Sequence, residues 1–379
     1  MSRVLVACLL AELAVAGLFV VSCADDEHRR TSREQATGGG GACEAAPGQI
    51  PLATCDNSEG SCSPTPGCTI DEARCGSKST CLPTSDNKGK DVLDFRIRRL
   101  NIATPAALAG SFIQNTVVNL NIDLNEKACG ELGKGLFTWL LQVDKKNNTM
   151  TTGGAPPSSD PIGTGFCFAR FDLNGQRVEP IVAKIAFDGP KFTAQETHDV
   201  RIPIFLSEQL ASAILLPISD ALVKDVTISD EGNCIGHFRE AALDPSCVEA
   251  REICTKWTTS GALGGYITLE DADGVKIRDL NNKSLCAFLS GESELSCKRD
   301  AGGAITYKGD YCSKTKAPGG CQDSVWLAAT FAASAVKIFD GQGKVDGCSG
   351  ATTGDAGPGD ASASDAADAG DDAGDAATD

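Results

Sequence analysis

The sequence predicts a mainly β protein, with an antiparallel β-sandwich-like body and a few short helices, preceded by a small disulfide-rich module. Three observations lead to this prediction. Several segments alternate apolar and polar residues with the period of half-buried strands. Clusters of Gly, Pro, Asn and Asp separate these segments, which favours antiparallel pairing. The 379 residues include 41 Gly and 18 Cys, which is typical of a turn-rich, disulfide-linked protein.

The first 22 residues have the form of an export leader. Arg3 precedes an apolar run over 4–21, which is too short and too near the terminus for a typical anchor helix. The run ends in the motif Val20-Val21-Ser22-Cys23. This motif resembles the lipobox of bacterial lipoproteins, in which the leader is cut before a cysteine that then receives acyl chains such as palmitate. The resemblance implies that 1–22 is a signal peptide and that Cys23 is the lipidation site.

Lipidation would anchor the chain in the cell envelope, because two or three acyl chains at one residue bind a membrane firmly. Ala24 rather than Asp follows Cys23, so the inner-membrane retention signal of enteric bacteria is absent and the outer membrane is the expected location. An ordinary secretory leader with a chance cysteine is the alternative. Leader and acidic tail together resemble those of surface lipoproteins from environmental Gram-negative bacteria, particularly myxobacteria. The main body resembles no characterised family.

Residues 23–42 predict a disordered tether, because charged residues and four consecutive glycines offer nothing to form a core. Residues 43–82 then contain six cysteines. So short a segment buries little apolar surface, and we expect disulfides within it to supply its order. The sequence does not choose among the possible pairings. Zinc is disfavoured because no pair of cysteines has the short spacing of structural zinc sites.

After a polar connector, residues 92–350 predict a β-rich, disulfide-linked domain. Four segments alternate as half-buried strands do. Their apolar positions are Val118, Leu120, Ile122 and Leu124; Phe137, Trp139, Leu141 and Val143; Ile181, Ala183, Ile185 and Phe187; and Val200, Ile202, Ile204 and Leu206. The segment 324–338 fits either a helix, from its alanines, or a buried strand, from residues such as Phe331 and Val336. We favour the strand.

Two helices are expected within this domain. Ser246 and Glu249 form a capping box that would begin a helix ending near Trp257. Thr268 would cap a second, short helix over 269–272.

The first helix constrains its two cysteines. Cys247 and Cys254 would stand about 10 Å apart along the axis, whereas a disulfide needs Cα atoms within about 7 Å. We therefore expect each to pair elsewhere, with Cys234 and Cys286 among the candidates.

The cysteine count argues for disulfides and against thiol chemistry. Of the 18 cysteines, Cys8 leaves with the leader and Cys23 is acylated, which leaves an even 16. In an oxidising compartment all of these can pair, so that no thiol is left to act as a nucleophile. The candidates are Cys43, Cys55, Cys62, Cys68, Cys75, Cys81, Cys129, Cys167, Cys234, Cys247, Cys254, Cys286, Cys297, Cys312, Cys321 and Cys348.

No motif names a reaction, and we predict no catalytic residue, metal or cofactor. His198 beside Asp199, or His237 near Glu240, could act as a base oriented by a carboxylate, but polar loop residues often have this appearance. Ser313 to Lys316 matches S-x-x-K, which penicillin-recognising enzymes need at the start of a buried helix rather than in a short loop. We interpret that match as coincidence.

The stretch from Asp271 to Gly274 has some features of a calcium loop. If Gly274 stood at the sixth position, Leu269 and Leu280 would occupy the first and last ligand positions, where oxygen is needed. The EF-hand interpretation therefore fails, and an irregular calcium site is the remaining alternative.

Charge limits the partners. The formal net charge is −17, and an acidic chain is repelled by phosphate backbones, so a nucleic-acid partner is disfavoured. Residues 351–379 form an Asp/Ala/Gly tail that we expect to be disordered. Trp139 and Trp257 fall at predicted core positions, which leaves Tyr266, Tyr307 and Tyr311 for carbohydrate contact.

These features favour a membrane-anchored extracytoplasmic lipoprotein with a non-catalytic binding or envelope-structural role. Its partner would be an unknown envelope protein or glycan. The alternative is an extracytoplasmic hydrolase acting on polysaccharide or peptide, which would need a cleft where acidic or histidine side chains converge.

Overall fold

The computed structural model describes residues 45–54, 72–76, 80–110, 113–126, 129, 131, 133–173, 175–238, 257–277, 280–339 and 346–348. The predicted signal peptide, tether and acidic tail lie outside these residues. So do Cys23, most of the six-cysteine module and the helix predicted from Ser246, except for its last residue, Trp257.

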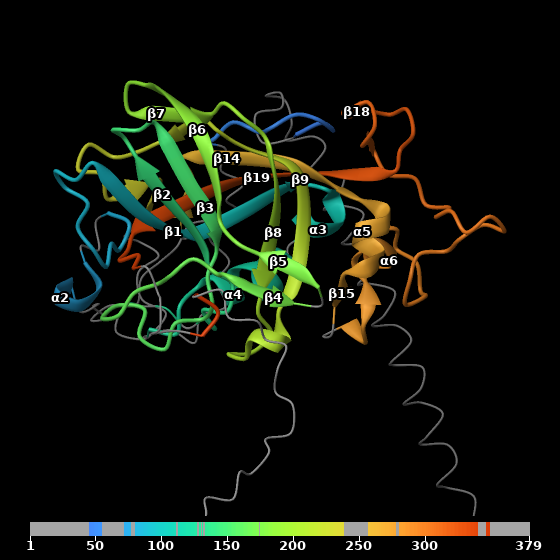
Figure 1. Ribbon diagram of the computed structural model, residues 1–379, viewed down its shortest axis with the longest axis horizontal. Helices are drawn as coiled ribbons and strands as arrows, with labels where there is room; N and C mark the ends of the chain where they lie inside the picture. The colour runs from blue at the N-terminus through green and yellow to red at the C-terminus, as the bar shows by residue number, and fades with distance from the viewer. Residues whose placement is uncertain are drawn as a thin grey trace, which may run out of the picture.

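One large antiparallel sheet forms the body, and it curls into a half-barrel. Its strands lie in the order β10-β7-β6-β3-β2-β1-β19-β14-β9-β8. In Figure 1, β2, β3, β6, β8 and β9 pass in front of β1, β14 and β19. Their bounds are β1 Val92–Thr104, β2 Trp139–Asp144, β3 Thr149–Gly154, β6 Ile181–Asp188, β7 Lys191–Ala194, β8 His198–Ile204, β9 Ile214–Lys224, β10 Val226–Thr227, β14 Gly261–Thr268 and β19 Ser324–Ala335.

Short elements decorate this sheet. Strands β11 (Cys234–Ile235), β17 (Tyr311–Cys312) and β18 (Ala317–Pro318) extend it off the main path. Three separate pairs are β4 (Phe171–Leu173) with β5 (Gln176–Val178), β12 (His237–Phe238) with β13 (Trp257–Thr258), and β15 (Lys276–Ile277) with β16 (Lys283–Ser284). The helices are α2 (Glu72–Cys75), α3 (Ala106–Ala109), the π-helix η1 (Ile113–Asn119), α4 (Leu120–Ile122), the 3-10 turn η3 (Leu210–Ser212), α5 (Leu269–Gly274) and α6 (Leu285–Leu289).

The mainly β, antiparallel prediction is confirmed, but the sheet is a single curled one rather than the two facing sheets of a sandwich. Its strands form one continuous hydrogen-bonded order from β10 to β8, and the curl of this single sheet gives it a concave face. The main apolar core fills that face with alternate residues of the strands, including Phe95, Leu141, Ile185 and Ile202. The strands predicted in these three segments are therefore confirmed as β2, β6 and β8, and burial alternates clearly in β6, whereas Leu140 of β2 and Pro203 of β8 are buried as well.

The segment 324–338 is a strand over Ser324–Ala335, as favoured from the sequence. All twelve of its residues are buried, because β19 lies between β1 and β14 and is covered on both faces. Phe331 points into the main core, whereas Trp326 and Ala332 belong to two other apolar clusters on the outer face. Burial on both sides explains why the sequence shows no clear alternation there.

The strand predicted over 118–124 is wrong, because this stretch lies largely in the helical turns η1 and α4. Strand β2 pairs with β1 only over Val92–Arg96. Farther along β1, the side chain of Gln114 takes the place of a neighbouring strand: it accepts a hydrogen bond from Ile102 N (3.0 Å) and donates to Leu100 O. The Gln114 side chain therefore makes hydrogen bonds to β1 that the backbone of a neighbouring strand would otherwise make.

The short helix predicted at 269–272 is confirmed as α5, and Thr268 caps it by accepting a hydrogen bond from Asp271 N at 3.1 Å. Trp257 lies in strand β13 rather than at the end of a helix. Its ring packs edge-on against Phe238 of the paired strand β12, with 4.9 Å between ring centroids. Cross-strand aromatic packing thus fixes Trp257 in extended backbone.

Five disulfides join described cysteines: Cys75–Cys129, Cys81–Cys234, Cys167–Cys348, Cys286–Cys297 and Cys312–Cys321. Pairing within the 43–82 module is therefore wrong for Cys75 and Cys81, which bond to the body. The suggestion that Cys234 and Cys286 pair with Cys247 and Cys254 is also wrong, since both have other partners. The remaining six candidates, Cys43, Cys55, Cys62, Cys68, Cys247 and Cys254, lie outside the described residues.

Candidate binding groove

A groove of about 370 Å³ opens where several turns of the half-barrel meet. It is formed by the connector before β1, the start of β1, the β2–β3 and β6–β7 turns, and the loop after β10. Leu93, Phe187 and Ile228 supply its apolar part, and Lys145 is one of its charged residues. The volume falls within the range of small-ligand sites.

One wall of the groove is fixed by a buried asparagine. The Asn87 amide nitrogen donates to Asp94 O (3.0 Å) and Gly232 O (3.1 Å), and Asn87 N donates to the side chain of Asn233 (2.7 Å). Asn87 is only 1% exposed. These bonds join the connector to the loop after β10, so this wall is preformed.

Two carboxyl groups beside this wall have shifted pKa values. Hydrogen bonds from Lys88 N and then from Asn233 lower the pKa of Asp86, which stays ionised at neutral pH. Burial raises the pKa of Asp94, against a hydrogen bond from Gln142 at 2.8 Å. Both carboxyls are held by the fold and belong to its structure.

Ser229 and Glu231 are two further polar residues of the groove. The Ser229 hydroxyl caps its own turn by accepting hydrogen bonds from Asn233 N (3.2 Å) and Cys234 N (3.0 Å). Glu231 pairs with Lys88 at 3.5 Å, but both side chains are about two-thirds exposed, so the pair adds little. Neither of the two histidines in the described part of the chain lines the groove.

Those two histidines were considered from the sequence as bases oriented by a carboxylate, an arrangement that was not favoured. His198 Nε2 lies 3.8 Å from Glu196 Oε2, whereas Asp199 accepts a hydrogen bond from Asp220 N at 3.1 Å. The carboxylate paired with His198 is therefore Glu196 rather than the Asp199 that was considered from the sequence. His237 Nδ1 lies 2.6 Å from the Thr258 hydroxyl, and its suggested partner Glu240 is outside the described residues.

His198 and Glu196 also line a second cavity, inside the curl of the sheet. Its volume is about 20 Å³, and its other lining residues are mostly apolar, such as Met150, Val200 and Leu263. This space suffices for about one water molecule. It is too small to hold a substrate.

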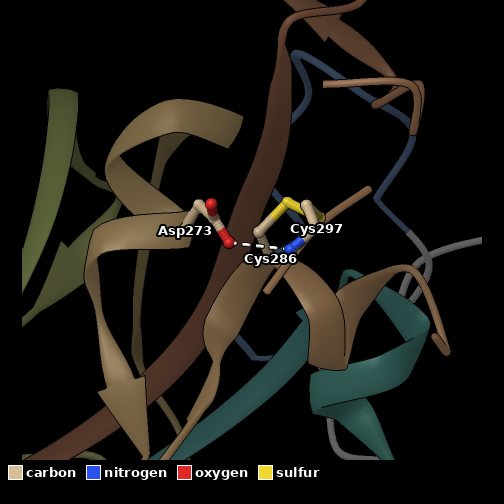
Figure 2. A group of neighbouring side chains, drawn as sticks. All are labelled: Asp273, Cys286 and Cys297. Carbon is tan, nitrogen blue, oxygen red and sulfur yellow. Dashed lines mark hydrogen bonds between the residues drawn. A yellow bond between two sulfur atoms is a disulfide. The ribbon is translucent and has the colours of Figure 1, made fainter. Parts of the chain in front are cut away.

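Figure 2 shows one of two groups of possible metal ligands among the described residues, Asp273 with Cys286 and Cys297. The two sulfurs are bonded to each other, so neither is a thiolate that could ligate a metal. The second such group, Cys312 and Cys321 with Asp323, contains a disulfide for the same reason.

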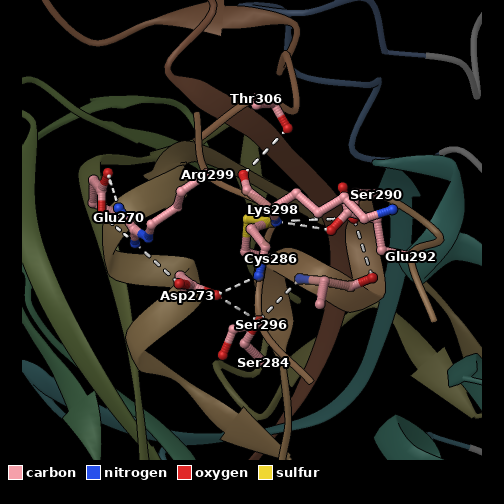
Figure 3. Close-up of a disulfide and its surroundings, with 12 residues drawn as sticks. Glu270, Asp273, Ser284, Cys286, Ser290, Glu292, Ser296, Lys298, Arg299 and Thr306 are labelled. Carbon is pink, nitrogen blue, oxygen red and sulfur yellow. Dashed lines mark hydrogen bonds and ion pairs between the residues drawn. A yellow bond between two sulfur atoms is a disulfide. The ribbon is translucent and has the colours of Figure 1, made fainter. Parts of the chain in front are cut away.

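The carboxylate of Asp273 is fully engaged by protein donors (Figure 3). One oxygen accepts from the Ser284 hydroxyl and from Cys297 N, each at 2.8 Å, and the other accepts from Arg299 at 3.0 Å. Arg299 also forms a bidentate pair with Glu270 at 2.8 and 2.9 Å. The irregular calcium site considered for this stretch therefore has no support here: these oxygens hold α5 and α6 together.

The S-x-x-K match is also structural. Ser313 donates through its backbone and its hydroxyl to Asp323, each at 2.8 Å, and Lys316 forms an ion pair with Asp220 at 2.9 Å. The motif lies in the loop that the Cys312–Cys321 disulfide closes, and not on a helix.

Most of the tryptophan and tyrosine residues singled out from the sequence are buried. Trp139 and Trp257 are buried, as predicted, but so are Tyr266 and Tyr311, which were expected to be accessible. Ala45 and Ile50 of segment 45–54 pack against the cluster that contains these two tyrosines. Tyr307 is partly buried against the main core.

The five disulfides indicate an extracytoplasmic protein, since such bonds persist in oxidising compartments. Among the described helices, none is long and apolar enough to cross a bilayer. No family model, curated protein or solved structure matches the chain.

Proposed function

We propose that this chain is a lipid-anchored envelope protein that binds a protein or glycan partner at the groove without transforming it. The groove carries the proposal: it is large enough for a ligand, one wall is preformed, and its serine is engaged in a turn. The lipobox resemblance at Cys23 and the disulfides support the anchored, extracytoplasmic part of the proposal. An outer-membrane location follows from Ala24.

The form of the groove suggests how a partner would bind. The half-buried Phe187 would contact an apolar group, beside the buried Leu93 and Ile228 that also line the groove, while the surrounding backbone and exposed charges would supply hydrogen bonds. An apolar centre with a polar rim is the usual anatomy of a recognition surface.

Crosslinking in intact envelopes tests this proposal with a matched pair of variants. Gly189→Trp places a large side chain in the groove, at a turn position with φ +61° and no atom within 4 Å of the added Cβ. Gly175→Trp is the control, because Gly175 has φ +74° and equally open surroundings but lies in the β4–β5 turn, away from the groove. We expect wild type and Gly175→Trp to capture the same partner and Gly189→Trp to capture at least tenfold less. Cys23→Ser should also release the protein from the membrane fraction.

Two results would contradict the proposal. Partner capture that is equal in the two tryptophan variants would show that the groove is not the binding surface. Hydrolysis of envelope polysaccharide or peptide by the purified protein, lost on Asp230→Asn or Glu231→Gln, would favour the hydrolase instead.

A further inference from the structure

Three aromatic rings form a row on the outer face of the sheet. Tyr266 of β14 stands opposite Trp326 of β19 in the strand register, and Tyr311 of β17 packs against both. The ring centroids are 5.2 Å apart for Tyr266 and Tyr311, and 5.0 Å apart for Tyr311 and Trp326. With Ala328, the row forms an apolar cluster separate from the main core.

The cover over this row is the chain's own segment 45–54, here called the strap. Ala45 and Ile50 pack against the row, and the Trp326 indole nitrogen donates a hydrogen bond to Gln49 O at 2.7 Å. A tight turn shapes the strap: Gln49 N donates to Ala46 O at 2.8 Å, and Gly48 has φ +79°. Proline followed by glycine at the two central positions is typical of a type II turn.

The sheet is shaped to receive the strap. A Cβ on Gly264 of β14 would lie 2.8 Å from the side chain of Ile50, so the glycine leaves the space that Ile50 fills. Gly48 in turn lies against Tyr311 and Pro318, to which an added Cβ would be 3.4 Å. The contact is thus complementary on both sides.

The strap is only partly buried: Pro51 and Ala53 are buried, whereas five of its ten residues are exposed. Leu52 is 57% exposed, and Ala46, Gln49 and Thr54 are exposed too. Among the described residues, the Trp326–Gln49 bond is the one hydrogen bond between strap and body. The strap lies on the face of the sheet and does not pair with any strand.

We propose that the aromatic row is a peptide-binding site that the strap occupies in cis. The site would take, from another molecule, a short peptide with a proline–glycine turn followed by an aliphatic residue. The chemistry is that of the observed contact: an indole N–H to a backbone carbonyl, aromatic rings against the turn, and the Gly264 space for the aliphatic side chain. Because the strap belongs to the same chain, its effective concentration is on the order of millimolar, and it excludes free peptide at lower concentrations. This site shares no lining residue with the groove, so the two proposals stand independently.

Fluorescence anisotropy with a labelled, end-blocked peptide of residues 45–54 tests the site on the full chain. Ile50→Asp should release the strap by placing a charge in the Gly264 space, and the labelled peptide should then bind. Leu52→Asp is the matched control, because the same change at the exposed position of the strap should leave the site covered, as in wild type. Adding Trp326→Phe to Ile50→Asp removes the N–H donor. Peptide binding should then weaken about tenfold, which corresponds to the loss of one hydrogen bond between uncharged groups.

Hydrogen exchange over residues 45–54 shows separately whether the strap is released. An Ile50→Asp chain that keeps slow exchange there contradicts a displaceable strap. One that exchanges fast but binds no peptide, or binds cellohexaose in its place, contradicts a peptide site. Equal binding by wild type, Ile50→Asp and Leu52→Asp would show that the peptide binds elsewhere.

Discussion

Two arginines of β1 are buried on the outer side of the sheet. Arg96 and Arg98 alternate with Phe95 and Ile97, and both are at most 1% exposed. Arg96 donates to Ile122 O at 2.6 Å, and burial lowers its pKa to about 9, so it stays charged at neutral pH. These residues fasten irregular segments to the sheet.

Arg98 forms a buried ion pair with Glu131 at 2.7 Å. Burial raises the pKa of Glu131, and the attraction of Arg98 opposes that rise. Within the described residues, Arg98 Nε and Glu131 Oε2 have no hydrogen-bond partner. Such a pair contributes less to stability than its short distance suggests. Removing one partner would still be destabilising, because it would leave the other charge buried without a counter-charge.

Asp273 is a partly buried carboxyl whose lowered pKa predicts a pH dependence of stability. Burial alone would raise its pKa, but hydrogen bonds from Cys297 N, Ser284 and Arg299 outweigh burial and lower the pKa below its ordinary value of 3.8. The carboxylate therefore stabilises the folded state above pH 3.8, and this contribution is lost as the pH falls through the lower, folded-state pKa.

We expect Asp273→Asn to reduce the free energy of unfolding by about 1–3 kcal/mol at pH 7, as measured by urea unfolding. The difference from wild type should shrink below pH 3.8, where wild type itself loses the charge. The exposed Asp188 provides a charge-matched control, and Asp188→Asn should have little effect. A difference that stays constant down to pH 2 would show that the ionised carboxylate is not the source.

Single residues show why the sequence revealed one face of the sheet and not the other. Ile185 and Val200 are flanked by exposed residues, so their alternation predicts both the strand and the side that faces the core. Arg96 and Arg98 occupy the outward positions of β1, where charged residues indicate solvent. They are buried because distant segments cover them, and sequence periodicity carries no information about such contacts.

At the scale of elements, the outer face is covered by segments that lack regular structure. The backbone N–H groups of Thr84 and Ser85 donate to Ala335 O at the end of β19, at 2.9 and 3.3 Å. Ala332 of the same strand packs with Cys81 and Leu82 of this covering segment. The groove could not be predicted from the sequence, because its walls come from turns far apart in the chain and depend on the bonds of Asn87.

The disulfides fall into two classes by the length of chain that they close. Cys81–Cys234 spans 153 residues and fastens the segment before β1, whereas Cys312–Cys321 spans 9 and closes a local loop. In the chain-entropy model these spans correspond to about 5 and about 3 kcal/mol.

We therefore expect the double variant Cys81→Ala/Cys234→Ala to lose more stability in urea than Cys312→Ala/Cys321→Ala. The two variants remove the same number of sulfur atoms, so each serves as the control for the other. An equal or reversed loss would indicate that the segment before β1 is held mainly by its other contacts.

At the scale of the whole molecule, one curled sheet supports two separate surfaces. The turns at one end of its strands form the groove, and the outer face bears the aromatic row beneath the strap. Three long-range disulfides, Cys75–Cys129, Cys81–Cys234 and Cys167–Cys348, join covering segments to one another or to the sheet. This arrangement preforms the wall of the groove and buries the arginines.

Peptide mapping of the exported protein by mass spectrometry, without reduction, tests this arrangement most directly. We predict linked peptides for Cys75–Cys129 and Cys81–Cys234, together with Cys167–Cys348. Links from Cys75 or Cys81 to Cys43, Cys55, Cys62 or Cys68 would contradict the account. They would restore an independent six-cysteine module and leave the outer face of the half-barrel without its covalent attachment.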